Sequence, residues 1–276
     1  MKDFALQVSH VSKKFGQNVI LHDLNFTINH NTKLAIIGHN GSGKSTLLKL
    51  LANIYAPTSG EINTFGKKMS YVPEHFPEHI RFTLGEYLLH IGTIGGESRQ
   101  VVQEKIKTYC ERFNIESHIH TYLKKCSKGT KQKAGLIQAL LNDRDILLLD
   151  EPLTGLDDES KKTFLQIIQE KQRDMTLIFT THEQETVDIL AEEIITLEEG
   201  RIIKHEGITT RTLMKHITVR VSDRIETEEL KMYGTIISEQ GHIVELKIPA
   251  RQSDACLFYL LNNDCSIIEL KETKER

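Results

Sequence analysis

Short runs of β-forming residues open the chain. They predict strands at Phe4–Val8, Val19–Leu24 and Phe26–Ile28, with a turn at Gly16–Asn18. A turn between consecutive short strands favours antiparallel pairing. We therefore expect a small antiparallel sheet at the start of the chain.

Longer apolar runs without alternation predict strands that are buried on both faces. Leu34–Ile37, Ile146–Leu149 and Thr176–Thr180 are of this kind, and helical patterns lie between them. Strands of this type are typical of a mainly parallel sheet in an α/β domain. Further strands are predicted at 61–65, 69–72, 193–197 and 201–206, and helices at 44–52, 158–172 and 183–190.

Two other regions have different patterns. Between about 83 and 143 the apolar residues recur at helical spacing, which predicts a helical subdomain inserted into the α/β core. After Gly207 the pattern alternates around 217–221 and 244–248, and it continues with a predicted helix at 251–262 and a strand at 266–270. We expect a domain at 1–207 and a small α+β accessory domain at 208–276.

Composition excludes several classes of protein. The chain has 276 residues, 39% of them hydrophobic, and a formal net charge of −3, so nothing favours binding to nucleic acid. Its four cysteines form no C-x-x-C pair, no run approaches the ~18 apolar residues of a membrane helix, and Met1–Phe4 lacks the features of a secretory signal. We expect a cytoplasmic protein whose only metal is a nucleotide-bound Mg²⁺.

The segment Gly38–Ser45 reads G-H-N-G-S-G-K-S between a predicted strand and a predicted helix. In that context, G-x-x-x-x-G-K-[ST] forms a loop whose backbone N–H groups surround a polyphosphate. Lys44 is expected to contact the β- and γ-phosphates, and Ser45 to ligate Mg²⁺. The segment predicts a site for Mg·ATP, made by Gly38, His39, Asn40, Gly41, Ser42, Gly43, Lys44, Ser45 and Thr46.

Two carboxylates, Asp150 and Glu151, follow the apolar run that ends at Leu149. At the carboxyl end of a strand beside a phosphate loop, Asp150 is expected to hold Mg²⁺ and Glu151 to polarise the attacking water. The structural alternative is an acidic pair that caps the next helix.

With these segments in order, residues 4–206 resemble the ATP-binding subunit of an ABC (ATP-binding cassette) transporter. The resemblance implies that Phe15 stacks on adenine, although a core position for this ring is the alternative. It also implies that Thr154–Asp157 is the D-loop, which communicates between two sites of a dimer, and that His182 contacts the γ-phosphate. Glu151, His182 and Lys44 are then the catalytic residues.

Residues Cys126–Gln132 resemble the family signature, usually written LSGGQ, and are called the signature segment below. Ser127 and Gly129 match the positions that face the γ-phosphate bound by the opposite subunit. Cys126, Lys128 and Thr130 depart from the usual leucine, glycine and glutamine.

A further departure lies in the Q-loop, where Glu74 follows Tyr71–Pro73 in place of the usual glutamine. A carboxylate is a stronger oxygen ligand for Mg²⁺ than an amide, so Glu74 joins Ser45 and Asp150 as a candidate metal ligand. The alternative is a solvated loop residue. Proline followed by glutamate is similar to a branch of bacterial exporters of drugs, antimicrobial peptides or lipids.

The resemblance implies an ATPase that dimerises around two Mg·ATP and powers transport, with export preferred. Its partners would be a second ATP-binding subunit, in a homodimer or a heterodimer, and integral membrane permease subunits, which would place the chain on the cytoplasmic face of the membrane. The alternative is an ABC ATPase without a membrane partner, such as an assembly factor or a ribosome-associated factor. The role of residues 208–276, regulatory, dimer-stabilising or only packing, stays open.

Overall fold

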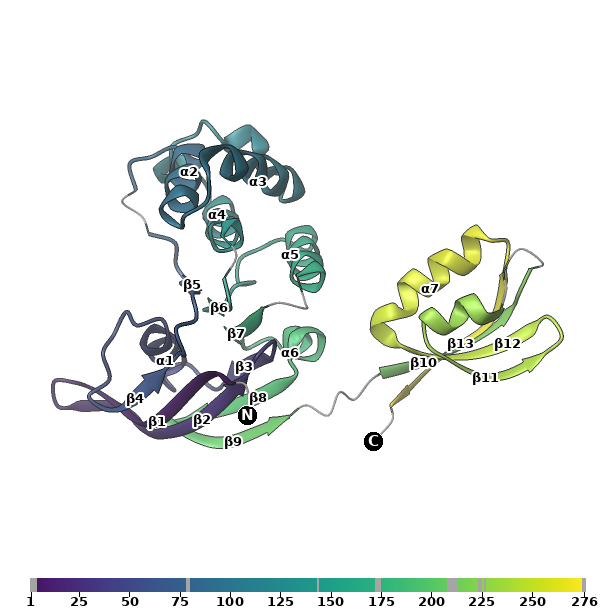
Figure 1. The fold of residues 1–276 in the computed structure, drawn as a ribbon, viewed down its shortest axis with the longest axis horizontal. Coiled ribbons are helices and arrows are strands. Elements are labelled where there is room, and N and C mark those ends of the chain that lie inside the picture. The colour runs from purple at the N-terminus through teal and green to yellow at the C-terminus, as the bar shows by residue number, and fades with distance from the viewer. Residues whose placement is uncertain are drawn as a thin grey trace. The chain divides into compact units, whose positions relative to one another are not determined.

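The computed structural model describes residues 4–77, 80–142, 144–171, 175–207, 213–222, 225 and 227–274. The chain divides into two compact units, Met1–Gly207 (unit 1) and Ile208–Arg276 (unit 2). Residues 208–212, where the second domain is expected to begin, lie outside the described residues. Each unit is described by itself (Figure 1).

The centre of unit 1 is a six-stranded sheet in the order β5-β6-β7-β3-β8-β9. Neighbours are parallel except β8 and β9, so the predicted mainly parallel sheet is confirmed. Every residue of β6 and β7 is buried, which explains why their sequences do not alternate. The strands are β3 (Lys33–Ile37), β5 (Met69–Val72), β6 (Ile146–Leu149), β7 (Thr176–Thr180), β8 (Glu193–Glu198) and β9 (Arg201–Gly207).

A second sheet in unit 1 is antiparallel, with the order β2-β1-β4. Its strands are β1 (Phe4–Phe15), β2 (Asn18–Asn29) and β4 (Ser59–Asn63). β1 runs further than the predicted Phe4–Val8 because irregularities in its pairing, with His10 at φ 52°, bend the strand without ending it. Apolar residues of β1, β2, β3 and β6 form one core with helix α1 (Lys44–Leu51).

The remaining helices of unit 1 form the helical subdomain and flank the parallel sheet. The predicted helical subdomain contains α2 (Leu84–Ile94), α3 (Arg99–Arg112), the 3₁₀ turns η1 (Glu116–His118) and η2 (Leu123–Lys125), and α4 (Lys128–Leu141). α2 begins at a capping box of Thr83 and Glu86, which fixes its start. Two more helices, α5 (Asp158–Glu170) and α6 (Gln184–Leu190), lie beside the parallel sheet in Figure 1.

Unit 2 is a four-stranded antiparallel sheet with a helix packed on it. Its elements are β10 (Leu213–Arg220), η3 (Thr227–Met232), β11 (Thr235–Gln240), β12 (Ile243–Pro249), α7 (Ala250–Asn262) and β13 (Ser266–Lys274). The strand order β11-β12-β10-β13 is that of a split βαβ unit, with η3 in place of the first helix. Apolar residues of the sheet and α7 form a separate core. β11 was not predicted.

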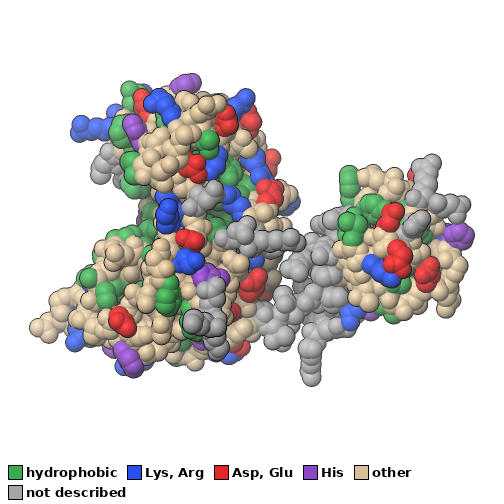
Figure 2. Space-filling view, in the orientation of Figure 1, with side chains coloured by type: hydrophobic (Ala, Val, Ile, Leu, Met, Phe, Trp, Pro, Cys, Tyr) green, Lys and Arg blue, Asp and Glu red, His purple; other side chains and the backbone are tan. Residues whose placement is uncertain are grey.

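Two features of the surface bear on function. Among the described residues no helix is both long enough and apolar enough to cross a bilayer. Positive and negative side chains are interspersed over the face of unit 1 seen in Figure 2, without a large area of one sign.

Candidate nucleotide site

The phosphate loop follows the carboxyl end of β3 and leads into α1. Gly38, Gly41 and Gly43 have φ of 153°, 83° and 104°. A Cβ on Gly38 would lie 2.1 Å from the carbonyl oxygen of Leu197, and a Cβ on Gly43 would lie 2.7 Å from Leu21. Positive φ and lack of space both require glycine here, and the turn they allow leaves the loop open to a polyphosphate.

Lys44 begins α1 and is buried beneath the loop. Its Nζ donates to the carbonyl oxygen of Gly38 at 2.8 Å and to that of His39 at 3.1 Å. Gly43 is the N-cap of α1, and no side chain in the described part of the chain caps the start of this helix. The positive end of the helix and the ammonium group therefore both face the loop, which favours an anion there.

Asp150 lies at the carboxyl end of β6, 2% exposed, and collects three hydroxyl groups. Its Oδ1 accepts hydrogen bonds from Ser45 Oγ at 3.1 Å and from Thr180 Oγ1 at 2.8 Å, and its Oδ2 accepts one from Tyr71 at 3.4 Å. Burial and the nearby Asp150 raise the pKa of the Tyr71 hydroxyl, so it stays a donor. Ser45 and Asp150 thus present adjacent oxygen atoms, a set that fits Mg²⁺.

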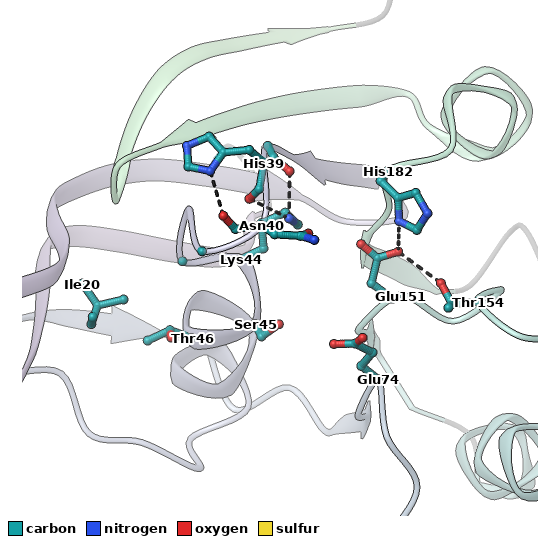
Figure 3. Close-up of a pocket in the computed structure, with 13 residues that line it drawn as sticks. Ile20, His39, Asn40, Lys44, Ser45, Thr46, Glu74, Glu151, Thr154 and His182 are labelled. Atoms are coloured by element: carbon teal, nitrogen blue, oxygen red, sulfur yellow. Dashed lines mark hydrogen bonds and ion pairs between the residues drawn. The ribbon is translucent and has the colours of Figure 1, made fainter. Parts of the chain in front are cut away.

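Glu151 follows in a left-handed conformation, with φ 48°. Its backbone N–H donates to Thr180 Oγ1 at 2.9 Å, and its Oε2 lies 2.9 Å from Nδ1 of His182 and 3.4 Å from the Thr154 hydroxyl. The acidic pair does not cap the next helix, because Asp157 is the N-cap of α5. The capping alternative is therefore wrong. His182 instead holds the Glu151 carboxylate near the carboxyl end of β6 (Figure 3).

One cleft of about 780 Å³ brings most of these side chains together. In Figure 3 the phosphate loop and α1 lie on one side, and Glu74, Glu151 and His182 on the other. No group of three His, Cys, Asp or Glu among the described residues has the geometry to hold a metal alone. The lining residues are Ile20, Gly38, His39, Asn40, Gly41, Gly43, Lys44, Ser45, Thr46, Glu74, Glu151, Thr154 and His182.

Comparison with known proteins identifies the family. A family model described as "ABC transporter" matches residues 21–154. The ABC transporter ATP-binding protein NatA of Bacillus subtilis (strain 168) is 31% identical over an alignment of 196 positions, and the match covers 66% of this chain and 80% of the relative. The chain belongs to the ABC transporter ATP-binding proteins. As an ABC ATPase of this family, it binds ATP.

Other comparisons agree. The Nod factor export ATP-binding protein I of Rhizobium sp. (strain N33) is 30% identical over an alignment of 233 positions, and the match covers 80% of this ABC ATPase and 76% of the relative. A solved ATP-binding subunit of an ABC transporter superposes with a TM-score of 0.70 at 24% identity, covering 75% of this chain and 91% of that one. A dimeric cassette bound to ADP and Pi superposes with a TM-score of 0.65 at 24% identity, and the match covers 74% of this chain and 98% of that one. The last two matches show the fold.

The signature segment of the ABC ATPase does not line the cleft. Ser127 is the N-cap of α4, and its Oγ accepts a hydrogen bond from the N–H of Thr130 at 3.1 Å and lies 2.9 Å from its hydroxyl. A Cβ on Gly129 would lie 3.6 Å from the carbonyl oxygen of Gly155, so the signature segment lies against the D-loop of its own chain. Neither Ser127 nor Gly129 therefore contributes to the nucleotide cleft of its own chain.

Three other predicted site residues, Phe15, Ser42 and Asp150, do not line the cleft either, whereas Glu74 does. Phe15 is the last residue of β1 and is 45% exposed. Its ring packs edge-on against that of Tyr55, with 5.3 Å between the ring centroids. Ser42 is buried in the loop, and no hydrogen-bond partner of its hydroxyl is found among the described residues. Glu74 lines the cleft, and its carboxylate lies 3.8 Å from Nε2 of His75.

Sequence reasoning did not single out Ile20, Tyr71 or Thr180. Ile20 follows the turn between the first two strands, and it lines the cleft from β2. Thr180 is the last residue of an otherwise apolar strand, next to Thr181 and His182, and this position is the signal that could have identified it. Its single hydroxyl connects Asp150 and the backbone of Glu151.

Proposed function

We propose that this ABC ATPase pairs with a second ATP-binding subunit around two Mg·ATP molecules and powers export through separate membrane subunits. One observation carries the pairing: the cleft contains the phosphate loop, Glu151 and His182, whereas Ser127 and Gly129 lie outside it. A site that needs both sets is completed only when a second chain supplies Ser127 and Gly129. Because this chain carries both the cleft residues and the signature segment, a second copy of it can serve as the partner subunit.

The roles follow from the contacts. Lys44 and the N-terminus of α1 bind the phosphates, and Ser45, Asp150 and Glu74 would hold Mg²⁺, which neutralises phosphate charge when bound. Glu151 accepts a proton from the attacking water, and His182 orients the Glu151 carboxylate and contacts the γ-phosphate. The N-terminus of α4 in the second chain, with Ser127 and Gly129, binds the same γ-phosphate.

The coupling to export rests on relatives and on the Q-loop. The relative from Rhizobium carries export in its name and matches 80% of this chain. Glu74 faces both the nucleotide cleft and a second cavity of about 350 Å³, lined also by His75, Phe76, Lys128, Lys131 and Gln132. A loop with one side chain on both cavities is suited to pass changes at the nucleotide to a membrane subunit on the cytoplasmic face.

The test is retention of ATP by Glu151→Gln. This variant keeps every phosphate-binding residue, so it should bind ATP, lose nearly all hydrolysis and release ATP slowly from the closed pair. Adding Ser127→Arg should restore fast release, because Ser127 touches the partner's nucleotide and not the chain's own cleft. Wild-type turnover by Glu151→Gln, or slow release in the double variant, would contradict the proposal.

The membrane partner is tested separately. Affinity-purified protein from membranes should carry a polytopic membrane protein at stoichiometric amounts, and Glu74→Ala should reduce transport while ATP binding persists. Co-purification with ribosomes in place of a membrane protein would support the alternative of an ABC ATPase without a membrane partner.

A further inference from the structure

Unit 2 has two strands at the edges of its sheet, β11 and β13. β13 is nine residues long, and no strand among the described residues pairs with its outer edge. Its central residues Ile268 and Leu270 are 50% and 45% exposed. A long edge strand with apolar side chains is a template for pairing with another chain unless something covers it.

We propose that β13 pairs antiparallel with β13 of a second copy of this chain, so that two units 2 form one continuous sheet. The proposal goes beyond the nucleotide-driven pairing above, because it needs no nucleotide. An isologous contact of this kind requires a strand that is complementary to itself around a two-fold axis.

Charge and the length of strand that pairs together select the register. A two-fold axis perpendicular to the sheet lies midway between one residue of β13 and the same residue of the second copy, because only then do both copies keep α7 on the same face. Each such axis is named below by that residue. An axis on Glu269 would oppose two carboxylates, and an axis on Lys271 would oppose two ammonium groups. An axis on Leu270 places Glu269 opposite Lys271 of the second copy, twice, and opposes the two leucines. The other charge-matched axis, on Thr273, pairs only the last three residues of β13.

The local geometry supports this choice. Pairing of β13 with β10 is regular from Glu269 onward, so these residues alternate faces as the register requires. Within one chain Lys271 Nζ already lies 2.8 Å from Glu269, which shows that both side chains are on the same face. Leu270 pairs with the buried Ile217 and so lies on the face that carries the core, where a second Leu270 would cover it.

The other edge does not have this property. β11 is six residues long, and the shift in its pairing with β12 lies between Ile236 and Ser238. The shift in β13 lies before Glu269, outside the residues on which the proposed register depends. Its one charged residue, Glu239, is hydrogen-bonded to Thr227 of η3 at 2.9 Å. No arrangement of β11 against itself pairs opposite charges.

The consequence concerns the transport cycle. Five residues, 208–212, separate β9 from β10. Two copies held together by β13 keep their nucleotide-binding units at high effective concentration after ATP has been hydrolysed. The two nucleotide-binding units would then move apart after hydrolysis while the β13 contact keeps the two chains together.

The first experiment measures the mass of the full chain without nucleotide by sedimentation velocity. We expect a dimer that Leu270→Lys converts to monomer, whereas Ile237→Lys on β11, where the side chain is 46% exposed, leaves it dimeric. Glu269→Lys should weaken dimerisation roughly tenfold by opposing like charges. Glu269→Lys combined with Lys271→Glu should restore it.

The second experiment tests the register in a Cys126→Ser background, because the other three cysteines are buried. Directly opposed residues of antiparallel strands lie within disulfide range. Leu270→Cys should therefore form a covalent dimer on mild oxidation, and Ile237→Cys should not. A monomeric wild-type chain without nucleotide, or equal cross-linking of the two variants, would overturn the proposal, and neither readout depends on the ATP retention that tests the proposed function.

Discussion

Thr180→Val is the most informative perturbation of the site, because one buried hydroxyl holds both acidic residues. Thr180 is fully buried, and its Oγ1 donates to Asp150 at 2.8 Å and accepts from the N–H of Glu151 at 2.9 Å. Valine fills the same space without a polar atom. The substitution therefore removes two hydrogen bonds and leaves a buried N–H unpaired.

The magnitude follows from these contacts. A hydrogen bond to a charged group contributes roughly 1.5–3 kcal/mol, and a buried donor without a partner costs about 1–3 kcal/mol. We expect the free energy of unfolding of unit 1 to fall by roughly 3–5 kcal/mol. Glu151, held at φ 48° by this bond, should also leave its position, which lowers kcat by at least about tenfold.

Steady-state ATPase assays and urea unfolding, analysed as separate transitions for the two units, measure both effects. Thr180→Ser is the matched control, because it keeps the hydroxyl and should retain most of the turnover. ATP affinity should change little in either variant, since Lys44 and the phosphate loop are untouched. Wild-type kcat and stability in Thr180→Val would refute the assignment of Thr180.

Two other predictions concern single side chains. Lys44→Ala should weaken ATP binding itself, because it removes the ammonium group beneath the phosphate loop, and unchanged affinity in a titration would contradict this. Hydrogen bonds from Ser160 lower the pKa of Asp157 to about 2, below its unfolded value, so the bonded carboxylate stabilises the fold above roughly pH 4 and this contribution is lost as the pH falls toward 2. The thermal midpoint of Asp157→Asn should therefore depend less on pH across that window than that of the wild type, and identical slopes would show that the cap has no such role.

Local patterns in the sequence predicted much of unit 1. The strand, glycine loop and helix around Lys44 form one contiguous motif, and the apolar run before Asp150 identifies a buried strand with its carboxyl end at the site. Both signals are short-range, so the sequence alone was sufficient to place these residues on their elements.

Contacts between distant segments were not predictable in the same way. Nothing in the pattern shows that the hydroxyl of Thr180 connects Asp150 and Glu151, because the partners are some thirty residues apart. β11 was missed because its edge position leaves it largely exposed, without the apolar alternation of a half-buried strand. Phe15 packs against Tyr55 and does not line the cleft, and this contact too joins segments that are distant in the sequence.

The central claim is that two chains share each ATP site. Glu151→Gln lacks the catalytic carboxylate, and Ser127→Arg lacks a working signature segment, so each variant should be inactive alone. When the two are co-expressed with different tags and purified through both, one site of each mixed pair combines an intact Glu151 with an intact Ser127. The account predicts turnover well above that of either variant, and a mixed pair as inactive as its parents would contradict it.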